Sequence, residues 1–177
     1  MSEPEIAILR QKIHGLSADD YATALRSRLP DTEIAVARTP DEEQALIESV
    51  PIVTGFSMDS TEVDAPNLDL FGCVYAGVGH LDLDAFEANG TAVTNASGVH
   101  GPNIGEYVLG AILSYVRGFK QAWRQAERNE WRSYPARELQ GSTVTVVGLG
   151  AIGQAVVDRL DPFGVDTIGV RYTPEKG

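Results

Sequence analysis

A glycine-rich turn between a strand and a helix limits the fold of this chain more than any other segment. Gly148-Leu149-Gly150-Ala151-Ile152-Gly153 follows the β-branched run 143–147 and precedes an amphipathic segment, 151–160, and a second strand, 166–170. In a β-α-β unit the first glycine permits the tight turn, the second lets a ligand approach the backbone, and the third allows the helix to pack closely. The pattern predicts a Rossmann-type dinucleotide-binding unit; the alternative is a glycine turn in a ligand-free α/β domain.

The residues around this turn indicate how the dinucleotide would bind. Free amides near Ala151 and Ile152 would point at a pyrophosphate, and the helix dipole adds to the attraction. At the end of the second strand, where Asp or Glu binds the ribose of NAD, this chain has Arg171, followed by Tyr172 and Thr173. Because a guanidinium binds phosphate with paired hydrogen bonds, we expect NADP(H) to be preferred over NAD(H). The alternative is that Arg171 caps the strand edge and faces water.

The first hundred residues alternate short β-branched runs with amphipathic stretches. Strands are predicted at 5–9, 33–38, 51–54, 71–75 and 91–94. Ser17 can cap a first helix, Thr39-Pro40 opens a second, and a third begins near Asp82 and ends at Asn89-Gly90. Strands that alternate with helices predict a parallel sheet covered on both faces.

Residues 103–128 show a long helical pattern that only the glycines at 105, 110 and 118 interrupt. Its apolar stripe consists of Ile104, Val108, Ile112, Tyr115 and Val116. An arm rich in Arg, Gln and Glu, with Trp123 and Trp131, then runs to Tyr134-Pro135. This region is either core plus ordinary surface or a subunit interface, where Trp, Tyr and Arg are enriched.

Charge and composition exclude several classes of protein. With 25 Asp plus Glu against 14 Lys plus Arg, the chain is not a general nucleic-acid binder. No apolar run approaches the roughly 20 residues that cross a bilayer, and the start MSEPE is not a signal peptide. One cysteine, Cys73, cannot form an internal disulfide, which favours a cytoplasmic location. His14 and His80 lack metal-ligand spacing and are expected to be surface groups, so no metal is expected.

Lysine is rare among the cations: only three of the 14 are Lys, and the rest are Arg. A carboxylate-rich, lysine-poor surface is typical of proteins from a salt-rich cytoplasm, where self-repulsion is screened. Adaptation to high salt is therefore one hypothesis, and an ordinary acidic protein is the other.

Four segments occur in a fixed order: YAGVGHLD at 75–82, NASGVHGPNIGE at 95–106, ELQG at 138–141 and the glycine turn. Together they resemble the D-isomer-specific 2-hydroxyacid dehydrogenase family. The resemblance implies an α/β fold, with most of a flavodoxin-like substrate domain over residues 1–100. Residues 101–177 would form a helical dimerisation arm and the first β-α-β, incomplete, of an NAD(P)-binding Rossmann domain.

The family's activity is hydride transfer between NAD(P)H and a 2-oxo acid, giving a D-2-hydroxy acid. The resemblance therefore implies an oxidoreductase that acts on such small molecules as a homodimer. A competing reading is a non-catalytic dinucleotide-binding scaffold of the same fold, like the C-terminal-binding-protein corepressors. The family's catalytic Arg, Glu and His are expected beyond Gly177, so the chain is expected to be a fragment without a catalytic residue or turnover of its own.

The resemblance also implies roles for individual residues in substrate binding. Backbone amides of Ala76, Gly77 and Val78 would bind the substrate carboxylate, since small residues expose N–H groups to an anion. Gly79 departs from the Asp that is common at this place in the family.

Roles are also implied for two further pairs of residues. Phe56 and Met58 would line a pocket for an apolar substituent of the substrate, or else belong to the core. His100 would contact the substrate and Asn103 the cofactor, both beside the nicotinamide ring; otherwise they are hinge and helix-capping residues.

Overall fold

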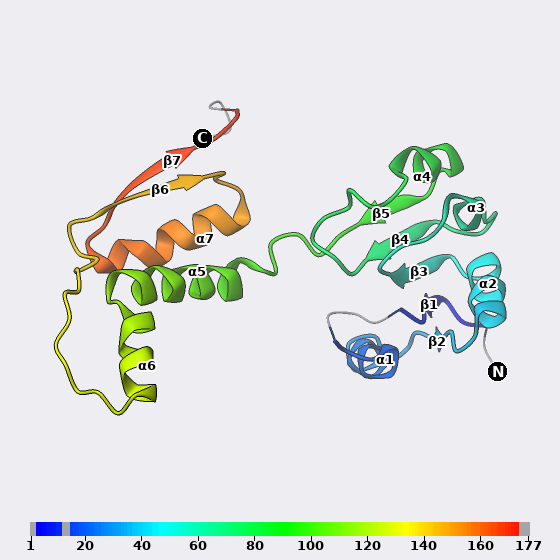
Figure 1. Cartoon of the computed structure of the whole chain (residues 1–177). Helices are drawn as coiled ribbons and strands as arrows, with labels where there is room; N and C mark the ends of the chain where they lie inside the picture. The colour runs from blue at the N-terminus through cyan, green and yellow to red at the C-terminus, as the bar shows by residue number, and fades with distance from the viewer. Residues whose placement is uncertain (1–2, 12–14, 174–177) are drawn as a thin grey trace. The chain divides into compact units, whose positions relative to one another are not determined.

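The computed structural model describes residues 3–11 and 15–173, which form two compact units. The first comprises Met1–Ser97 and the second Gly98–Gly177, and each is described by itself (Figure 1). Within the described residues, no helix has the length and apolar character that a membrane span requires.

The first unit is built on a five-stranded parallel sheet. Its strands, in the spatial order β2-β1-β3-β4-β5, are β2 (Ile34–Val36), β1 (Ile6–Ile8), β3 (Ile52–Gly55), β4 (Leu70–Cys73) and β5 (Ala92–Thr94). This is the strand order of flavodoxin-like folds, so the predicted α/β class is confirmed. Each of the five predicted strands is present, with slightly different bounds.

Four helices cover the two faces of this sheet: α1 (Ala18–Arg26), α2 (Pro40–Ser49), α3 (Ser60–Val63) and α4 (Leu83–Asn89). Successive residues of β1 point to opposite faces. Ile6 and Ile8 pack with α1, whereas Ala7 belongs to the larger cluster that includes Ile47 of α2 and Phe86 of α4. The predicted covering of both faces is confirmed, while the single turn of α3 was not predicted.

The helix ends follow the capping residues in the sequence. The Ser17 hydroxyl accepts a hydrogen bond from the Asp20 N–H at 3.1 Å, and Thr39 caps α2 through the Glu42 N–H at 3.2 Å. Gly90 ends α4 in the left-handed region, with φ of 78°. These caps were predicted from local sequence and are confirmed.

The second unit contains the β-α-β segment at the predicted bounds. Strand β6 (Thr143–Val147) leads into α7 (Ala151–Leu160), and a short 3₁₀ turn, η1 (Asp161–Phe163), leads to β7 (Asp166–Val170). The two strands pair in parallel. Leu139, Val156 and Leu160 form the core with residues of β6 and of the preceding helix.

The long helix predicted over 103–128 is wrong in one respect, because the chain forms two helices there. They are α5 (Gly101–Val116) and α6 (Phe119–Glu127), and Gly118 between them has a φ of 66°. A Cβ on Gly118 would lie 2.9 Å from the Tyr134 ring, so the arm packs against this break.

The apolar stripe of α5 is also only partly buried. Val108, Ile112 and Val116 pack against the core of the unit. Tyr115, which was predicted to belong to the stripe, is 76% exposed, and the Arg137 guanidinium lies 5.7 Å from the centre of its ring.

Candidate functional site

The three glycines of the turn between β6 and α7 have different environments. Gly148 has a φ of 94°, a conformation that side chains rarely allow. A Cβ on Gly153 would overlap the carbonyl oxygen of Gly148, so the helix packs directly on the turn. A Cβ on Gly150 would meet no atom within 4 Å. The geometry fits a tight turn at Gly148 and close packing at Gly153, while the approach of a ligand to Gly150 stays a prediction.

The first turn of α7 offers backbone donors beside this open space. Gly150 is the N-cap residue, and its carbonyl accepts from the Gln154 N–H at 3.0 Å. The preceding N–H groups of the helix, including those of Ala151 and Ile152, have no partner within the helix. Both residues are exposed. Unpaired amides, the positive end of a helix dipole and a glycine without a neighbour form a set of groups that fits a diphosphate.

Two hydrogen bonds join the end of β7 to the glycine turn. The Gly148 N–H donates to the carbonyl of Val170 at 2.7 Å, and Nη2 of Arg171 donates to the carbonyl of Leu149 at 3.0 Å. The Leu149 side chain packs so closely on Gly169 that a Cβ there would overlap it. Arg171 is half-buried against the turn, so a fixed positive charge lies next to the open space at Gly150.

The two residues after Arg171 are more exposed than Arg171 itself. Tyr172 and Thr173 are exposed, and neither makes a hydrogen bond that fastens it to the turn within the described part of the chain. The sequence predicted all three as cofactor contacts, and the structure brings Arg171 to the turn.

The start of α5 lies beside the start of α7. A Cβ on Gly101 would lie 3.3 Å from the Ala155 Cβ and 3.7 Å from the Ala151 carbonyl oxygen, and one on Gly105 would lie 2.9 Å from Cδ of Arg159. The contacts advance in the same direction along both helices, so their N-termini are neighbours.

His100 and Asn103 lie at the start of α5. His100 occupies the N-cap position of α5, without a side-chain capping bond, and Asn103 is exposed in the first turn. Their contacts with substrate and cofactor stay predictions.

A second group of predicted residues lies at the carboxyl edge of the first sheet, where ligands of open α/β sheets usually bind. Phe56 follows β3, and the loop of Ala76, Gly77 and Val78 follows β4. Two bonds from the segment after β5 hold this loop: the Ala96 N–H donates to the Tyr75 carbonyl at 3.0 Å, and the Asn95 side chain donates to the Ala76 carbonyl at 2.8 Å.

Phe56 is fixed by two residues whose roles the sequence analysis missed. Oε1 of Gln11 accepts from the N–H groups of Phe56 and Ser57 at 2.9 and 3.2 Å, and its Nε2 donates to the Ser57 carbonyl at 3.1 Å. His80 stacks on the Phe56 ring with centroids 4.3 Å apart, and its Nε2 lies 2.7 Å from the Phe56 carbonyl oxygen. His80 is exposed, as expected, but it joins the loop after β4 to the loop after β3.

The sequence carried a usable signal for Gln11 but not for the contact of His80. Gln11 lies just beyond β1 at the same carboxyl edge, which is a signal that could have identified it. Nothing in the spacing of His80 indicated its contact with Phe56. His14, the other histidine interpreted as a surface group, lies outside the described residues.

Of the two alternatives for Met58, the structure supports the core. Met58 is 6% exposed and belongs to the core cluster with Val63 and Phe71. The prediction that Met58 contacts the substrate is corrected accordingly, because its side chain is used in packing.

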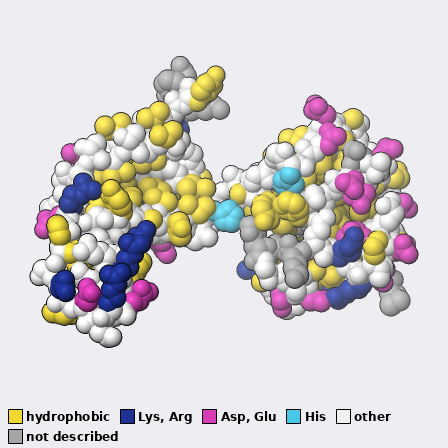
Figure 2. Space-filling model, in the orientation of Figure 1, with side chains coloured by type: hydrophobic (Ala, Val, Ile, Leu, Met, Phe, Trp, Pro, Cys, Tyr) yellow, Lys and Arg dark blue, Asp and Glu magenta, His cyan; other side chains and the backbone are white. Residues whose placement is uncertain are grey.

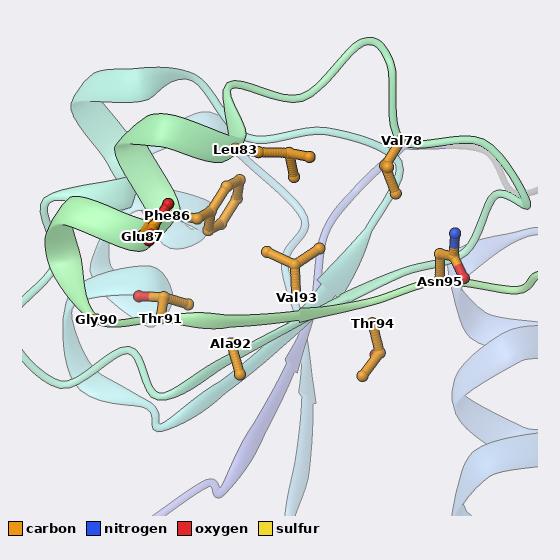
Figure 3. Close-up of a pocket in the computed structure, with 10 residues that line it drawn as sticks. All are labelled: Val78, Leu83, Phe86, Glu87, Gly90, Thr91, Ala92, Val93, Thr94 and Asn95. Carbon is orange, nitrogen blue, oxygen red and sulfur yellow. The ribbon is translucent and has the colours of Figure 1, made fainter.

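A cavity of about 790 Å³ lies beside β5 and α4 rather than at the loop after β3. Its walls include Phe86, Val93 and, toward the carboxyl end of β5, Val78 and Asn95 (Figure 3). A smaller cavity of about 300 Å³ lies at the carboxyl ends of β3, β4 and β5 and also includes Asn95. Asn95 therefore borders both cavities.

Charge is distributed unequally between the two units. Residues 1–97 carry 17 Asp and Glu against five Lys and Arg, whereas residues 98–177 carry eight against nine. The acidic side chains gather on the first unit and several basic ones on the second (Figure 2). The unit with the glycine turn is therefore close to neutral, which lessens the repulsion of an anionic dinucleotide.

Comparisons with known proteins agree with this geometry. Residues 109–177 match the family model described as D-isomer specific 2-hydroxyacid dehydrogenase, NAD binding domain. D-3-phosphoglycerate dehydrogenase of Methanocaldococcus jannaschii is 30% identical over 159 residues, which cover 86% of this chain and 30% of that protein. Its counterpart in Mycobacterium tuberculosis (strain CDC 1551 / Oshkosh) is 31% identical over 149 residues, covering 82% and 27%.

Solved structures give the same result. A D-isomer specific 2-hydroxyacid dehydrogenase family protein from Aeromonas salmonicida superposes with a TM-score of 0.77 and 29% identity over 96% of this chain and 54% of that one. A formate dehydrogenase from Staphylococcus aureus in complex with NAD superposes with a TM-score of 0.69 and 24% identity over 93% of this chain and 55% of that one. At this level of identity the similarity supports the fold alone. The chain spans about half the length of these solved structures and less than a third of the two curated relatives.

Proposed function

Because this chain belongs to the D-isomer-specific 2-hydroxyacid dehydrogenase family, we propose that it acts as an oxidoreductase on a 2-oxo acid or D-2-hydroxy acid with NADP(H). A bound nicotinamide dinucleotide supplies or accepts the hydride in this chemistry. The observation that carries the proposal is the glycine turn at Gly150, open on the ligand side and fastened to the end of β7 by Arg171. Amides of Ala151 and Ile152 would bind the pyrophosphate, and Asn103 would contact the cofactor from the neighbouring α5.

The preference for NADP(H) rests on the residue that follows β7. A carboxylate at this place binds the two ribose hydroxyls of NAD and repels a 2′-phosphate. Arg171 has the opposite charge, and its guanidinium, which lies at the turn through its bond to the Leu149 carbonyl, is suited to paired hydrogen bonds with a phosphate. Tyr172 and Thr173 would extend the contact with the adenosine end.

The substrate is assigned to the carboxyl edge of the first sheet. Amides of Ala76, Gly77 and Val78 would bind its carboxylate, and Phe56, held by Gln11 and His80, would contact its apolar substituent. His100 is a further proposed substrate contact. A rigid aromatic side chain favours a 2-oxo acid with a small or flat apolar group.

We further propose that α5, α6 and the arm that follows form a homodimer interface. Large aromatic side chains are exposed on this part of the second unit, among them Tyr107, Trp123 and Trp131, at 78%, 61% and 102%. Aromatic residues and Arg are enriched at interfaces. Sedimentation of the chain should give a dimer, and Trp123→Glu should give a monomer.

The cytoplasmic location that the single cysteine favours is a separate prediction.

The proposed cofactor is tested by measuring binding of NADPH and NADH to the 177-residue chain by fluorescence. We expect NADPH to bind at least about tenfold more tightly, and Arg171→Asp to abolish or reverse this difference. Arg137→Asp makes the same charge change at the far end of α5 and should leave the ratio unchanged. Equal affinities for NADPH and NADH, both in the unchanged chain and in Arg171→Asp, would contradict the NADP(H) proposal.

A further inference from the structure

We propose that Asn95 is a positioning residue that turns the Gly77 N–H toward the carboxylate of the 2-oxo or 2-hydroxy acid. The inference rests on the proposed function, because it concerns the amides to which that carboxylate is assigned. Asn95 itself would not touch the substrate; it would act through the loop after β4.

Two hydrogen bonds carry the inference, and both join the segment after β5 to the loop after β4. The Ala96 N–H donates to the carbonyl of Tyr75 at 3.0 Å, and Nδ2 of Asn95 donates to the carbonyl of Ala76 at 2.8 Å. Two consecutive carbonyls of the loop are thus held by two consecutive residues of the neighbouring segment.

The direction of these carbonyls determines the direction of the amides. In a planar trans peptide the C=O and the N–H of the same unit point in opposite directions. The described residues contain no cis peptide, so the N–H groups of Ala76 and Gly77 both point away from Asn95 and Ala96. Successive N–H groups that point to one side form a concavity that binds anions.

The loop leaves room for such an anion. A Cβ on Gly77 would meet no atom within 4 Å, and Gly77 is exposed. Within the described ranges, no protein group accepts a hydrogen bond from the Gly77 N–H. The Gly77 N–H therefore points away from Asn95 and Ala96 and is accessible to an anion.

The side-chain amide of Asn suits this task because it both donates and accepts. Oδ1 of Asn95 accepts from the Ser97 N–H at 3.3 Å, and this bond leaves Nδ2 facing the Ala76 carbonyl. An aspartate would keep the bond to Ser97 but would present an oxygen to the Ala76 oxygen. Asn95 and Val78 lie toward the same end of the cavity beside β5 (Figure 3).

The test uses the 177-residue chain and 2-oxobutanoate as the probe, followed by amide NMR. In the unchanged chain the Gly77 resonance should shift as the acid is added, and the shifts give a Kd. In Asn95→Ala the Kd should rise at least about tenfold and the Gly77 shift should shrink, because the peptide is free to rotate. If Asn95→Ala fails to fold, Asn95→Asp, which keeps the Ser97 bond, should show the same loss.

Asn67→Ala is the matched control. Nδ2 of Asn67 donates to the carbonyl of Glu48 at 3.0 Å, which is the same kind of bond in the same unit, but Asn67 precedes β4 whereas the loop follows it. This variant should bind 2-oxobutanoate as the unchanged chain does.

The outcomes separate this inference from the proposed function. If Gly77 responds equally in the unchanged chain and in Asn95→Ala, while both are folded, the positioning role is wrong and the carboxylate site stands. If Gly77 does not respond in the unchanged chain, the carboxylate site itself is wrong, and the positioning role fails with it.

Discussion

Gly153 lies directly against the carbonyl oxygen of Gly148, so that a single methyl group on its Cα would overlap that oxygen. The contact is between backbone atoms, which cannot move aside as the end of a flexible side chain can. The glycine turn and α7 are therefore one rigid piece, whose remaining glycine, Gly150, has open space before it.

This contrast predicts that alanine at Gly153 lowers stability, whereas alanine at Gly150 weakens dinucleotide binding. Gly153→Ala should lower the free energy of unfolding by about 1–3 kcal/mol, as overpacking does. Gly150→Ala should change stability by less than about 1 kcal/mol but weaken dinucleotide binding, because its methyl group would occupy the space for the pyrophosphate. Urea unfolding and fluorescence titration with NADPH measure the two effects. Normal binding by Gly150→Ala would mean that the dinucleotide does not lie on this turn.

Helix α5 provides a second matched pair. A Cβ on Gly105 would lie 3.2 Å from the Ala155 carbonyl oxygen, whereas one on Gly110 would meet nothing within 4 Å. Gly105→Ala should separate α5 from α7 and destabilise the unit by about 1–3 kcal/mol. Gly110→Ala should stabilise it by roughly 0.5–1 kcal/mol, because alanine favours the helix. Thermal unfolding measures both; equal effects at the two positions would contradict the close packing of the helices.

Gln11 should matter for the position of Phe56. Its side chain makes three hydrogen bonds to the backbone of Phe56 and Ser57. Gln11→Ala should destabilise the first unit by about 1–3 kcal/mol and loosen the Phe56 ring. Gln44, whose side chain bonds to Glu48 on the exposed surface of α2, is the control, and Gln44→Ala should change stability by less than about 0.5 kcal/mol.

Urea unfolding and NMR of the aromatic rings test the Gln11 prediction. If Phe56 keeps its ring-current shifts in Gln11→Ala, the stacked His80 alone fixes the ring.

Salt dependence distinguishes the two hypotheses for the acidic composition. With 17 carboxylates against five cations in residues 1–97, screening should raise the stability of the first unit. For an ordinary acidic protein the gain should end near about 0.15 M KCl, where the Debye length is already about 8 Å. For a salt-adapted protein it should continue to about 1 M. Urea midpoints at a series of KCl concentrations give the answer, and stability that rises when salt is removed would contradict both.

The elements that the sequence predicted well depend on neighbouring residues. Ser17 caps α1 through a residue three positions away, Gly90 ends α4 by its own φ, and β6, α7 and β7 begin and end as the glycine turn requires. The predictions that failed depend on distant partners. The helix breaks at Gly118 where the Tyr134 ring packs, and Met58 is drawn into the core by β4 and α3.

The sequence by itself determined the kind of fold, the glycine turn and the positive residue after β7, because hydrophobic period, capping and backbone freedom act over a few residues. Only the tertiary structure decided that Arg171 lies on the Leu149 carbonyl, that His80 stacks on Phe56 and that Asn95 holds Ala76. These pairs are 22, 24 and 19 residues apart. They meet because parallel strands bring their carboxyl ends to one edge, a relation that no local pattern encodes.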